Sequence, residues 1–487
     1  MSFPTPPMRE RMESATDDVA DLGAPAGLGS RATSFYERSR INKTFSPLTA
    51  GGIRQSIFVL VQTSLGGGIL TIAYMMRQSG FLLGIILLLL AGGVAAVSME
   101  VLMKSAVLQH RYTLGNLMSF VFGQSIGVAL DLMLFLYGNG SLITYFIFLG
   151  DFIPSIVEAL SPGYWPQPTL ERELSLEEMQ ELDELRTKCL VAALLLVLLP
   201  SLPRDLSGLR YLSPIMAIGI IYTEAVVVWK CFWLHLHHPD LTQGTISEML
   251  WPQDDLLSIL SRSVKAFSLC VFSYVCHLNV TPVAKELENA NDRRIEKVSW
   301  RVVFVQFGIY VLLAVAGYGT FGDDTKPNLL QNYSASDPWI LASRVGLTFT
   351  VLVAIATNTN PTVRASLCLL EVLFPFLKEP ALEGPNAEPL LKTPPLMKRA
   401  PEEPRPRRYV RYCLSIACLT MDTLVAIYVK NVASVVGFLG ATMGTLMMMV
   451  IPGLLVYKLP LFSSGWSRFF IVLFAFSAIA NCLAIFQ

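Results

Sequence analysis

Apolar residues follow one another along most of this chain in runs of about 20, the length that an α-helix needs to cross a membrane. Short polar segments separate the runs. Windows of that length predict eleven spanning helices, at residues 53–76, 81–103, 126–149, 189–202, 211–234, 264–283, 302–321, 340–363, 412–429, 434–457 and 467–486. The fourth run is short, and a helix that begins earlier, within the charged stretch before it, is an open alternative. The pattern predicts an all-α integral membrane protein that lies in a lipid bilayer.

The composition favours a membrane protein over a set of soluble domains. Of the 487 residues, 53% are hydrophobic and 15% are charged, whereas soluble domains contain about 25% charged residues. Lys and Arg together number 37, as do Asp and Glu, so no excess of basic residues indicates nucleic-acid binding. The 8 cysteines form no CxxC pair and no metal-ligand spacing. We therefore expect no metal and no cofactor, and a disulfide between Cys189 and Cys231 is conceivable but not expected.

The polar residues divide the chain into two parts. Residues 1–50 are rich in Pro, Gly, Ser and charges of both signs, which is typical of a disordered tail. Because no apolar run lies near Met1, we expect no cleavable signal peptide. Residues 51–487 contain all the apolar runs and form the predicted transmembrane domain.

The positions of Lys and Arg between the runs predict the orientation, because basic residues collect on the cytosolic side of a membrane. With a cytosolic N-terminus and eleven crossings, residues 378–411, rich in Lys and Arg, form a cytosolic loop. Residues 151–187, rich in Asp and Glu, then form an outer loop. Asn332 begins an Asn-Tyr-Ser pattern, a glycosylation candidate, and also falls outside.

Three consecutive glycines, Gly66, Gly67 and Gly68, interrupt the first apolar run. Each costs roughly 1 kcal/mol relative to alanine inside a helix. Transporters break helices at mid-membrane, where the free backbone N–H and C=O groups bind substrate, and glycine permits that conformation. Small residues can instead serve a close helix contact. Because three adjacent glycines cannot all face one neighbour, we predict a break.

A second break is expected in the sixth run, because inverted-repeat transporters place paired breaks at corresponding positions of two halves. With halves of five helices each, the sixth helix is the partner of the first. The centre of that run is unusually polar for a spanning helix, with Ser273, Tyr274, His277, Asn279, Thr281 and Pro282. The sequence therefore places a candidate second break where the symmetry requires one.

Four segments together resemble the amino acid/auxin permease family, near its sodium-coupled neutral amino acid transporters. They are "IFVLVQTSLGGGILTIAYMMRQSG" from Ile57, "FSYVCHLNVTPVAKELEN" from Phe272, "GYGTFG" from Gly317 and "VASVVGFLGATMGTLMMMVIPGLL" from Val432. The resemblance extends from about Gly51 to the C-terminus. It implies a five-plus-five inverted repeat of the APC-superfamily type, with broken helices 1 and 6 and an eleventh helix. It also implies secondary active transport of amino acids by alternating access.

The resemblance further implies where an amino acid would bind. Its carboxylate would meet the amides at the first break, since a helix N-terminus attracts anions, and its amino group would meet carbonyls at the second. The candidate substrate-binding residues are Ser64, Gly66, Gly67, Gly68, Ser273, Tyr274, Cys276, His277 and Asn358. For His277, a titrating role and a neutral structural role are both open.

Four candidate residues bear on the coupling ion, and they leave both H⁺ and Na⁺ open. Gln62 stands where sodium-coupled members of the family carry asparagine. Glu224 lies mid-depth in the fifth run, and a carboxyl within a membrane is a candidate functional group. Thr63 and Thr357 could instead supply oxygen ligands for sodium. A proton is slightly favoured.

No nucleophile elbow, P-loop or HExxH motif is present, so an enzyme is not expected. The alternative function is a sensor that binds an amino acid and signals without net transport. The plasma membrane and an endo-lysosomal or vacuolar membrane are both compatible with the sequence, and no feature indicates an oligomeric state.

Overall fold

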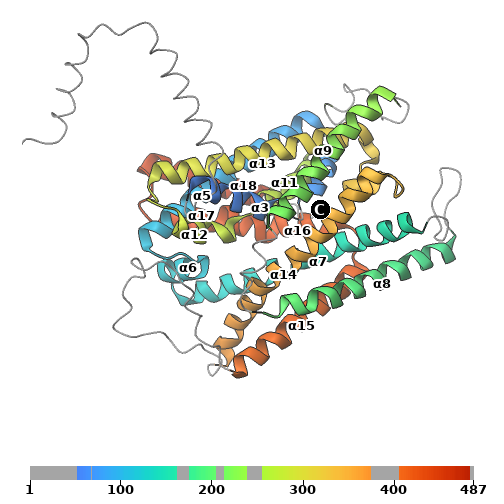
Figure 1. The fold of residues 1–487 in the computed structure, drawn as a ribbon. Helices are drawn as coiled ribbons and strands as arrows, with labels where there is room; N and C mark the ends of the chain where they lie inside the picture. The colour runs from blue at the N-terminus through green and yellow to red at the C-terminus, as the bar shows by residue number, and fades with distance from the viewer. Residues whose placement is uncertain are drawn as a thin grey trace, which may run out of the picture. The chain divides into compact units, whose positions relative to one another are not determined.

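The computed structural model describes residues 52–66, 68–161, 175–203, 213–237, 250, 255–374 and 405–482. Within these residues every regular element is a helix (Figure 1). The first five are α3 (Ile53–Ser64), the 3₁₀ helix η1 (Ile69–Thr71), α4 (Ile72–Ser79), α5 (Phe81–Gln109) and α6 (Leu114–Phe122). They are followed by α7 (Gln124–Leu160), α8 (Leu176–Ser201), α9 (Ser213–His237), α11 (Leu256–Tyr274), α12 (His277–Glu286) and α13 (Asp292–Phe321).

The remaining elements include two 3₁₀ helices and two π-helical turns. They are η4 (Gly322–Asp324), η5 (Leu329–Asn332), α14 (Pro338–Leu373), α15 (Arg405–Tyr428), α16 (Val432–Leu439), the π turns η7 (Gly440–Gly444) and η8 (Leu446–Val450), α17 (Ile451–Lys458) and α18 (Ser464–Cys482). The predicted all-α fold is therefore confirmed.

Nine helices among the described residues are long and apolar enough to cross a membrane, and the bent pair formed by α3 and Ile69–Ser79 makes up to ten. Each of the eleven predicted runs coincides with a helix or a broken pair. The predicted span that is not among these ten is α8, because its 26 residues include the charged residues Glu184, Arg186 and Lys188 near its middle. A helix that starts at Leu176, on a capping box of Ser175 and Glu178, explains why the fourth apolar run looked short.

The interpretation of residues 151–187 as a loop is wrong in its boundaries. Asp151 lies inside α7, which continues to Leu160, and Leu176 already begins α8. A helix of 37 residues is longer than the bilayer needs, so its charged end is expected to project beyond the hydrocarbon. Likewise, residues 405–411 of the predicted basic loop begin α15, and residues 378–404 lie outside the described part of the chain.

The helices form two groups. In the first, α7, α8, α14 and α15 pack on one another, and α7 with α14 makes the most extensive contact (Figure 1). In the second, α13 packs on α3, α4 and α5, while α11 and α12 pack on α5. Helices α9 and α16 each contact both groups. The two broken helices therefore belong to one group and face the other.

Close packing by elements near the C-terminal end of the chain holds α11 in place. A Cβ on Gly440 would lie 1.9 Å from the carbonyl oxygen of Ser268 in α11, so only glycine fits there. Asn481 of α18 donates to the Gly440 carbonyl oxygen at 2.8 Å and to Thr445, and it accepts from Ser268 Oγ at 2.6 Å. The backbone carbonyl exposed by the π turns is thus satisfied inside the protein, as it must be in a membrane.

Candidate functional site

Both predicted breaks are present. Helix α3 ends at Ser64, and the chain passes Leu65, Gly66 and Gly68 before η1 begins; Gly67 lies outside the described residues. Helix α11 ends at Tyr274, and α12 begins at His277. At each break the last carbonyls of one half-helix and the first amides of the next lack intrahelical partners.

Helix α13 joins the two breaks. The Tyr310 hydroxyl donates to the Ser273 carbonyl oxygen at 2.5 Å and lies 3.5 Å from the Ser64 carbonyl oxygen. Gln306 Nε2 donates to Ser64 Oγ at 2.5 Å. All four residues are buried, so these bonds set the distance between the broken segments without competition from water.

The glycines allow the backbones to approach closely. A Cβ on Gly68 would lie 2.8 Å from Ser273 Cα and 2.5 Å from its Oγ, which is nearer than real Cβ contacts occur. A Cβ on Gly66 would lie 2.7 Å from the Tyr145 hydroxyl oxygen of α7. Gly68 therefore lets the two breaks touch, and Gly66 lets the first break face α7.

A small cavity of about 50 Å³ lies where the breaks meet, and we name it the central cavity. It is lined by Thr63, Ser64, Tyr137, Ser141, Tyr145, Phe272, Val275, Cys276, His277, Leu278, Asn279 and Asn358. No Asp, Glu, Lys or Arg is among these residues. The central cavity thus offers hydroxyl, amide and backbone groups without a charged side chain.

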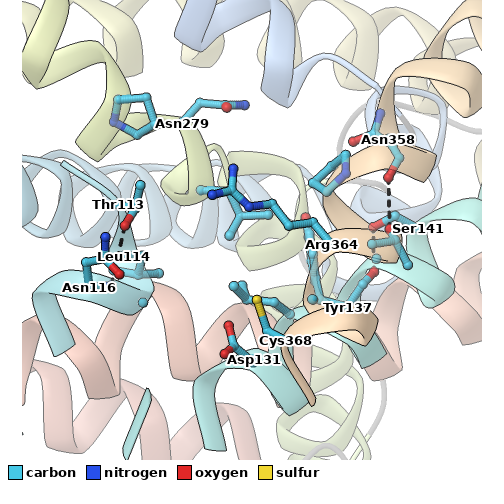
Figure 2. Close-up of a pocket in the computed structure, with 18 of the residues that line it drawn as sticks. Thr113, Leu114, Asn116, Asp131, Tyr137, Ser141, Asn279, Asn358, Arg364 and Cys368 are labelled. Atoms are coloured by element: carbon cyan, nitrogen blue, oxygen red, sulfur yellow. Dashed lines mark hydrogen bonds between the residues drawn. The ribbon is translucent and has the colours of Figure 1, made fainter. Parts of the chain in front are cut away.

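Two larger cavities adjoin it. The Gln62 cavity, about 460 Å³, is lined mainly by α3, α7, α9 and α14. The Arg364 cavity, about 430 Å³, lies among α6, α7, α12 and α14 (Figure 2). Asn279 and Asn358 line all three. Asn279 Nδ2 donates to Thr63 Oγ1 at 3.2 Å across the breaks, and Asn358 Nδ2 donates to the Ala354 carbonyl oxygen at 2.9 Å.

The structure brings many of the predicted site residues to these cavities. Ser64, Cys276, His277 and Asn358 line the central cavity. The Gln62 cavity collects Gln62, Thr63, Gly66 and Thr357 as well as Asn358. Three of the four candidate ion-coupling residues therefore surround one space.

Other predicted residues contribute differently. The imidazole of His277 is fully buried, with Nε2 2.5 Å from Ser98 Oγ of α5. Tyr274 is also fully buried, and its ring packs against Tyr310 with centroids 5.2 Å apart. Ser273 Oγ donates to the Leu269 carbonyl oxygen at 2.8 Å. These three side chains are engaged with the protein itself, and neither Tyr274 nor Ser273 lines any of the three cavities.

Glu224 and Asn332 stand apart from the breaks. Glu224 lies on α9 and lines none of the three cavities, and its buried Oε1 has no hydrogen-bond partner among the described residues. The Asn332 amide donates to the Asp324 carbonyl oxygen at 2.7 Å and accepts from the Lys326 amide at 2.9 Å. Glycosylation at Asn332 stays a prediction, and it would require this turn to rearrange.

The sequence reading overlooked the contribution of α7. Tyr137, Ser141 and Tyr145 line the central cavity, yet they lie within a run that was classed simply as apolar. Their spacing of four residues places them on one helix face, and that polar stripe was the available signal. Asn279 was noted as polar but not assigned to the site, and Arg364 was not singled out.

Comparisons with known proteins agree with this architecture. Vacuolar amino acid transporter 6 of Saccharomyces cerevisiae is 26% identical over 435 residues, covering 84% of this chain and 90% of that protein. Sodium-coupled neutral amino acid transporter 7 of Xenopus laevis is 23% identical over 446 residues, covering 87% of each. AAT1 of Toxoplasma gondii is 27% identical over 369 residues, 75% of this chain, which spans about half (47%) of that relative's length.

A solved structure and a family profile complete the comparison. MhsT in complex with L-phenylalanine matches with a TM-score of 0.56 at 11% identity, covering 88% of this chain and 97% of that chain; this likeness concerns the fold. The profile described as "Transmembrane amino acid transporter protein" matches residues 49–486. The chain therefore belongs to the family of transmembrane amino acid transporter proteins.

Proposed function

We propose that this protein moves amino acids across a membrane by alternating access, as a secondary active transporter. The observation that carries the proposal is the central cavity, where two broken helices meet and no charged side chain is present. A zwitterion can bind there through backbone groups, since free amides attract its carboxylate and free carbonyls its ammonium group. Membership of the family and the names of the relatives support amino acids as the substrate class.

Each side of the cavity has a proposed role. The amides that follow Gly66 would hold the carboxylate, and the last carbonyls of α11 would hold the ammonium group. The Ser273 carbonyl already accepts from Tyr310, so other carbonyls of that turn would serve. Tyr145, Asn279 and Asn358 would then contact the remainder of the substrate, because they line the same cavity from α7, α12 and α14.

Alternating access would follow from the two helix groups. The broken helices pack with α5 and α13, whereas α7 and α14 form the facing wall. A tilt of one group against the other would open the central cavity first to one side and then to the other. The Gln62 and Arg364 cavities, which share Asn279 and Asn358 with it, would be parts of the connecting paths.

Coupling to H⁺ or Na⁺ is part of the proposal. Gln62, Thr63 and Thr357 place oxygen atoms around the Gln62 cavity, which suits a sodium ion. Glu224 is half-buried on α9 and offers a carboxyl with one buried oxygen, Oε1, which suits a proton. Both a vacuolar and a sodium-coupled relative are known, so the plasma membrane and a vacuolar or endo-lysosomal membrane are both candidate locations.

Reconstitution tests the proposal. Purified protein in liposomes should accumulate one or more radiolabelled amino acids when a sodium or proton gradient is imposed. Asn279→Ala should reduce accumulation at least several-fold, whereas Asn139→Ala, on α7 outside the three cavities, should not. Saturable binding without accumulation would instead identify a sensor, and the transport proposal would be wrong.

A further inference from the structure

The Arg364 cavity contains two opposite charges that the protein leaves unpaired. Its lining includes one basic residue, Arg364 of α14, and one acidic residue, Asp131 of α7. Among the residues that the structure describes, neither side chain has an ion-pair partner within 4.0 Å or a hydrogen bond. Figure 2 shows the Arg364 guanidinium extending into the cavity, with the Asp131 carboxylate and Cys368 at the cavity wall.

Both charges have reasons to face the cavity. Arg364 is an exposed residue of a helix whose neighbours Val363 and Ala365 are buried, so its guanidinium projects away from the packed side. Asp131 lies against the start of α6, where a Cβ on Gly115 would be 3.7 Å from Asp131 Oδ1. The N-terminus of a helix favours a negative charge. The carboxylate is thus supported as an anion, and Arg364 is close enough to act on it as an opposite charge without forming an ion pair with it.

We propose that the Arg364 cavity is a second binding site for a zwitterionic amino acid, distinct from the central cavity. Arg364 would hold the α-carboxylate, since a guanidinium binds carboxylates through two parallel hydrogen bonds. Asp131 would hold the α-ammonium group from the opposite wall. One cation and one anion separated by a gap complement a zwitterion better than they complement an ion of a single charge.

The position of the cavity gives this site a role. It shares Tyr137, Ser141, Asn279 and Asn358 with the central cavity, so a bound amino acid would lie next to the central site and on a path that leads from it. The site would hold the substrate by its common head group, independently of the side chain. Identification of the occupant as an amino acid in transit rests on the proposed function, whereas recognition of a zwitterion rests on the two charges.

Cys368 provides a reporter inside the same cavity. It is partly exposed, and it lines the Arg364 cavity but not the other two. In a background with Cys231→Ser, Cys413→Ser and Cys482→Ser, the other cysteines are buried. The rate at which N-ethylmaleimide modifies Cys368 in purified protein then reports occupancy. L-Alanine is the probe, with its methyl ester and propionate as analogues that carry only one of the two charges.

L-Alanine at millimolar concentration should slow modification several-fold, and each analogue should protect less. Arg364→Gln and Asp131→Asn should each abolish the protection. Arg293→Gln, which removes an exposed basic residue outside the cavities, should retain it. Arg364→Lys should protect weakly, because it keeps the charge but loses the paired hydrogen bonds.

A variant of the central cavity separates the two proposals. Gly66→Val would place its side chain against Tyr145 and should abolish liposome uptake, while L-alanine should still protect Cys368. Loss of protection in Gly66→Val together with its retention in Arg364→Gln would show that Cys368 reports only the central site, and would overturn this inference alone. Absence of protection in the wild-type background would also overturn it. Absence of uptake by the protein with wild-type Gly66, with protection intact, would instead contradict the proposed function.

If Arg364 and Asp131 merely pair with each other when the cavity closes, a charge exchange should restore the pairing. The double variant Arg364→Asp with Asp131→Arg would then recover uptake, while L-alanine would fail to protect Cys368 in the wild-type background. That combination would assign a gate and not a binding site, and would contradict the inference. Protection in the wild-type background that either single variant removes supports the site.

Discussion

At the scale of single residues, the contact between the two breaks requires glycine at position 68. The absent side chain matters because Ser273 Cα occupies the space that a Cβ would need, at 2.8 Å. The contact joins residues that are 205 positions apart in the chain. A glycine run that a local reading explains by backbone freedom alone thus also serves long-range packing between the two breaks.

Gly68→Ala is expected to destabilise the protein and to reduce uptake. Overpacking of a filled interior costs about 1–3 kcal/mol, and here the displaced atoms belong to the second break. Gly93→Ala is the matched control, because no described atom beyond the neighbouring residues and backbone of its own helix lies within 4 Å of a Cβ at Gly93, and alanine favours a helix by up to about 1 kcal/mol. Thermal unfolding in detergent and liposome uptake measure both effects. Equal behaviour of the two variants would contradict the packing requirement.

At the scale of elements, α13 holds the broken helices through hydrogen bonds that no sequence motif predicts. Gln306 reaches the first break, and Tyr310 reaches the second and approaches the first. These residues are one helical turn apart, so a single face of α13 contacts both segments. A broken helix in a membrane needs such partners, since lipid cannot satisfy its backbone.

Tyr310→Phe is expected to cost about 1 kcal/mol of stability, the usual net contribution of one hydrogen bond, with a larger proportional loss of uptake. The Ser273 carbonyl would lose its donor while the ring stays in place. Tyr318→Phe is the control, because Tyr318 is buried on the same helix and its hydroxyl makes no hydrogen bond to any residue that the structure describes. The comparison requires melting temperatures and uptake rates of both variants. If Tyr318→Phe proves as damaging as Tyr310→Phe, the bond between α13 and α11 has no special role.

At the scale of the whole molecule, the coupling ion must connect binding to a gradient. We expect proton coupling through Glu224, which is half-buried on a helix that contacts both groups and whose buried Oε1 has no hydrogen-bond partner among the described residues. Uptake with choline in place of sodium should persist and should rise as the outer side is acidified. Glu224→Gln should remove this pH dependence, and Glu288→Gln, at an exposed position, should not.

A dependence of uptake on sodium would contradict proton coupling. Uptake that disappears without sodium at both acidic and neutral outer pH, with Glu224→Gln indistinguishable from wild type, would exclude the proton. The oxygen atoms around the Gln62 cavity would then be the candidates for a sodium site. Substitution of Thr357 by Val should in that case raise the sodium concentration needed for half-maximal uptake.

The orientation is also a property of the whole molecule. The distribution of basic residues predicts that Ser175, which caps α8, faces outside and that residue 393 faces the cytosol. Cysteine placed at Ser175, in a background without reactive cysteines, should be labelled by an impermeant thiol reagent on intact cells if the protein is at the cell surface. Cysteine placed at Thr393 should be labelled only after permeabilisation. The reverse pattern would invert the topology.

The sequence by itself determined the all-α class and the approximate positions of the apolar helices, because a bilayer demands long apolar runs and loops must carry the charges. It also determined the two breaks, because glycines and polar residues at mid-membrane are local departures from that rule. It misplaced the ends of α7 and α8, since helices that extend beyond the bilayer carry charge and no longer read as apolar.

Only the tertiary structure decided which side chains face a cavity. Tyr274 was expected to contact substrate, but its ring packs against Tyr310 and lines none of the three cavities. His277 does line the central cavity, with its Nε2 2.5 Å from Ser98 Oγ. Tyr145 of α7 was not expected and lines the central cavity. The physical reason is that the rotation of a helix about its axis is set by its neighbours. When every neighbour is also apolar, the chain carries little local signal of which face will meet which.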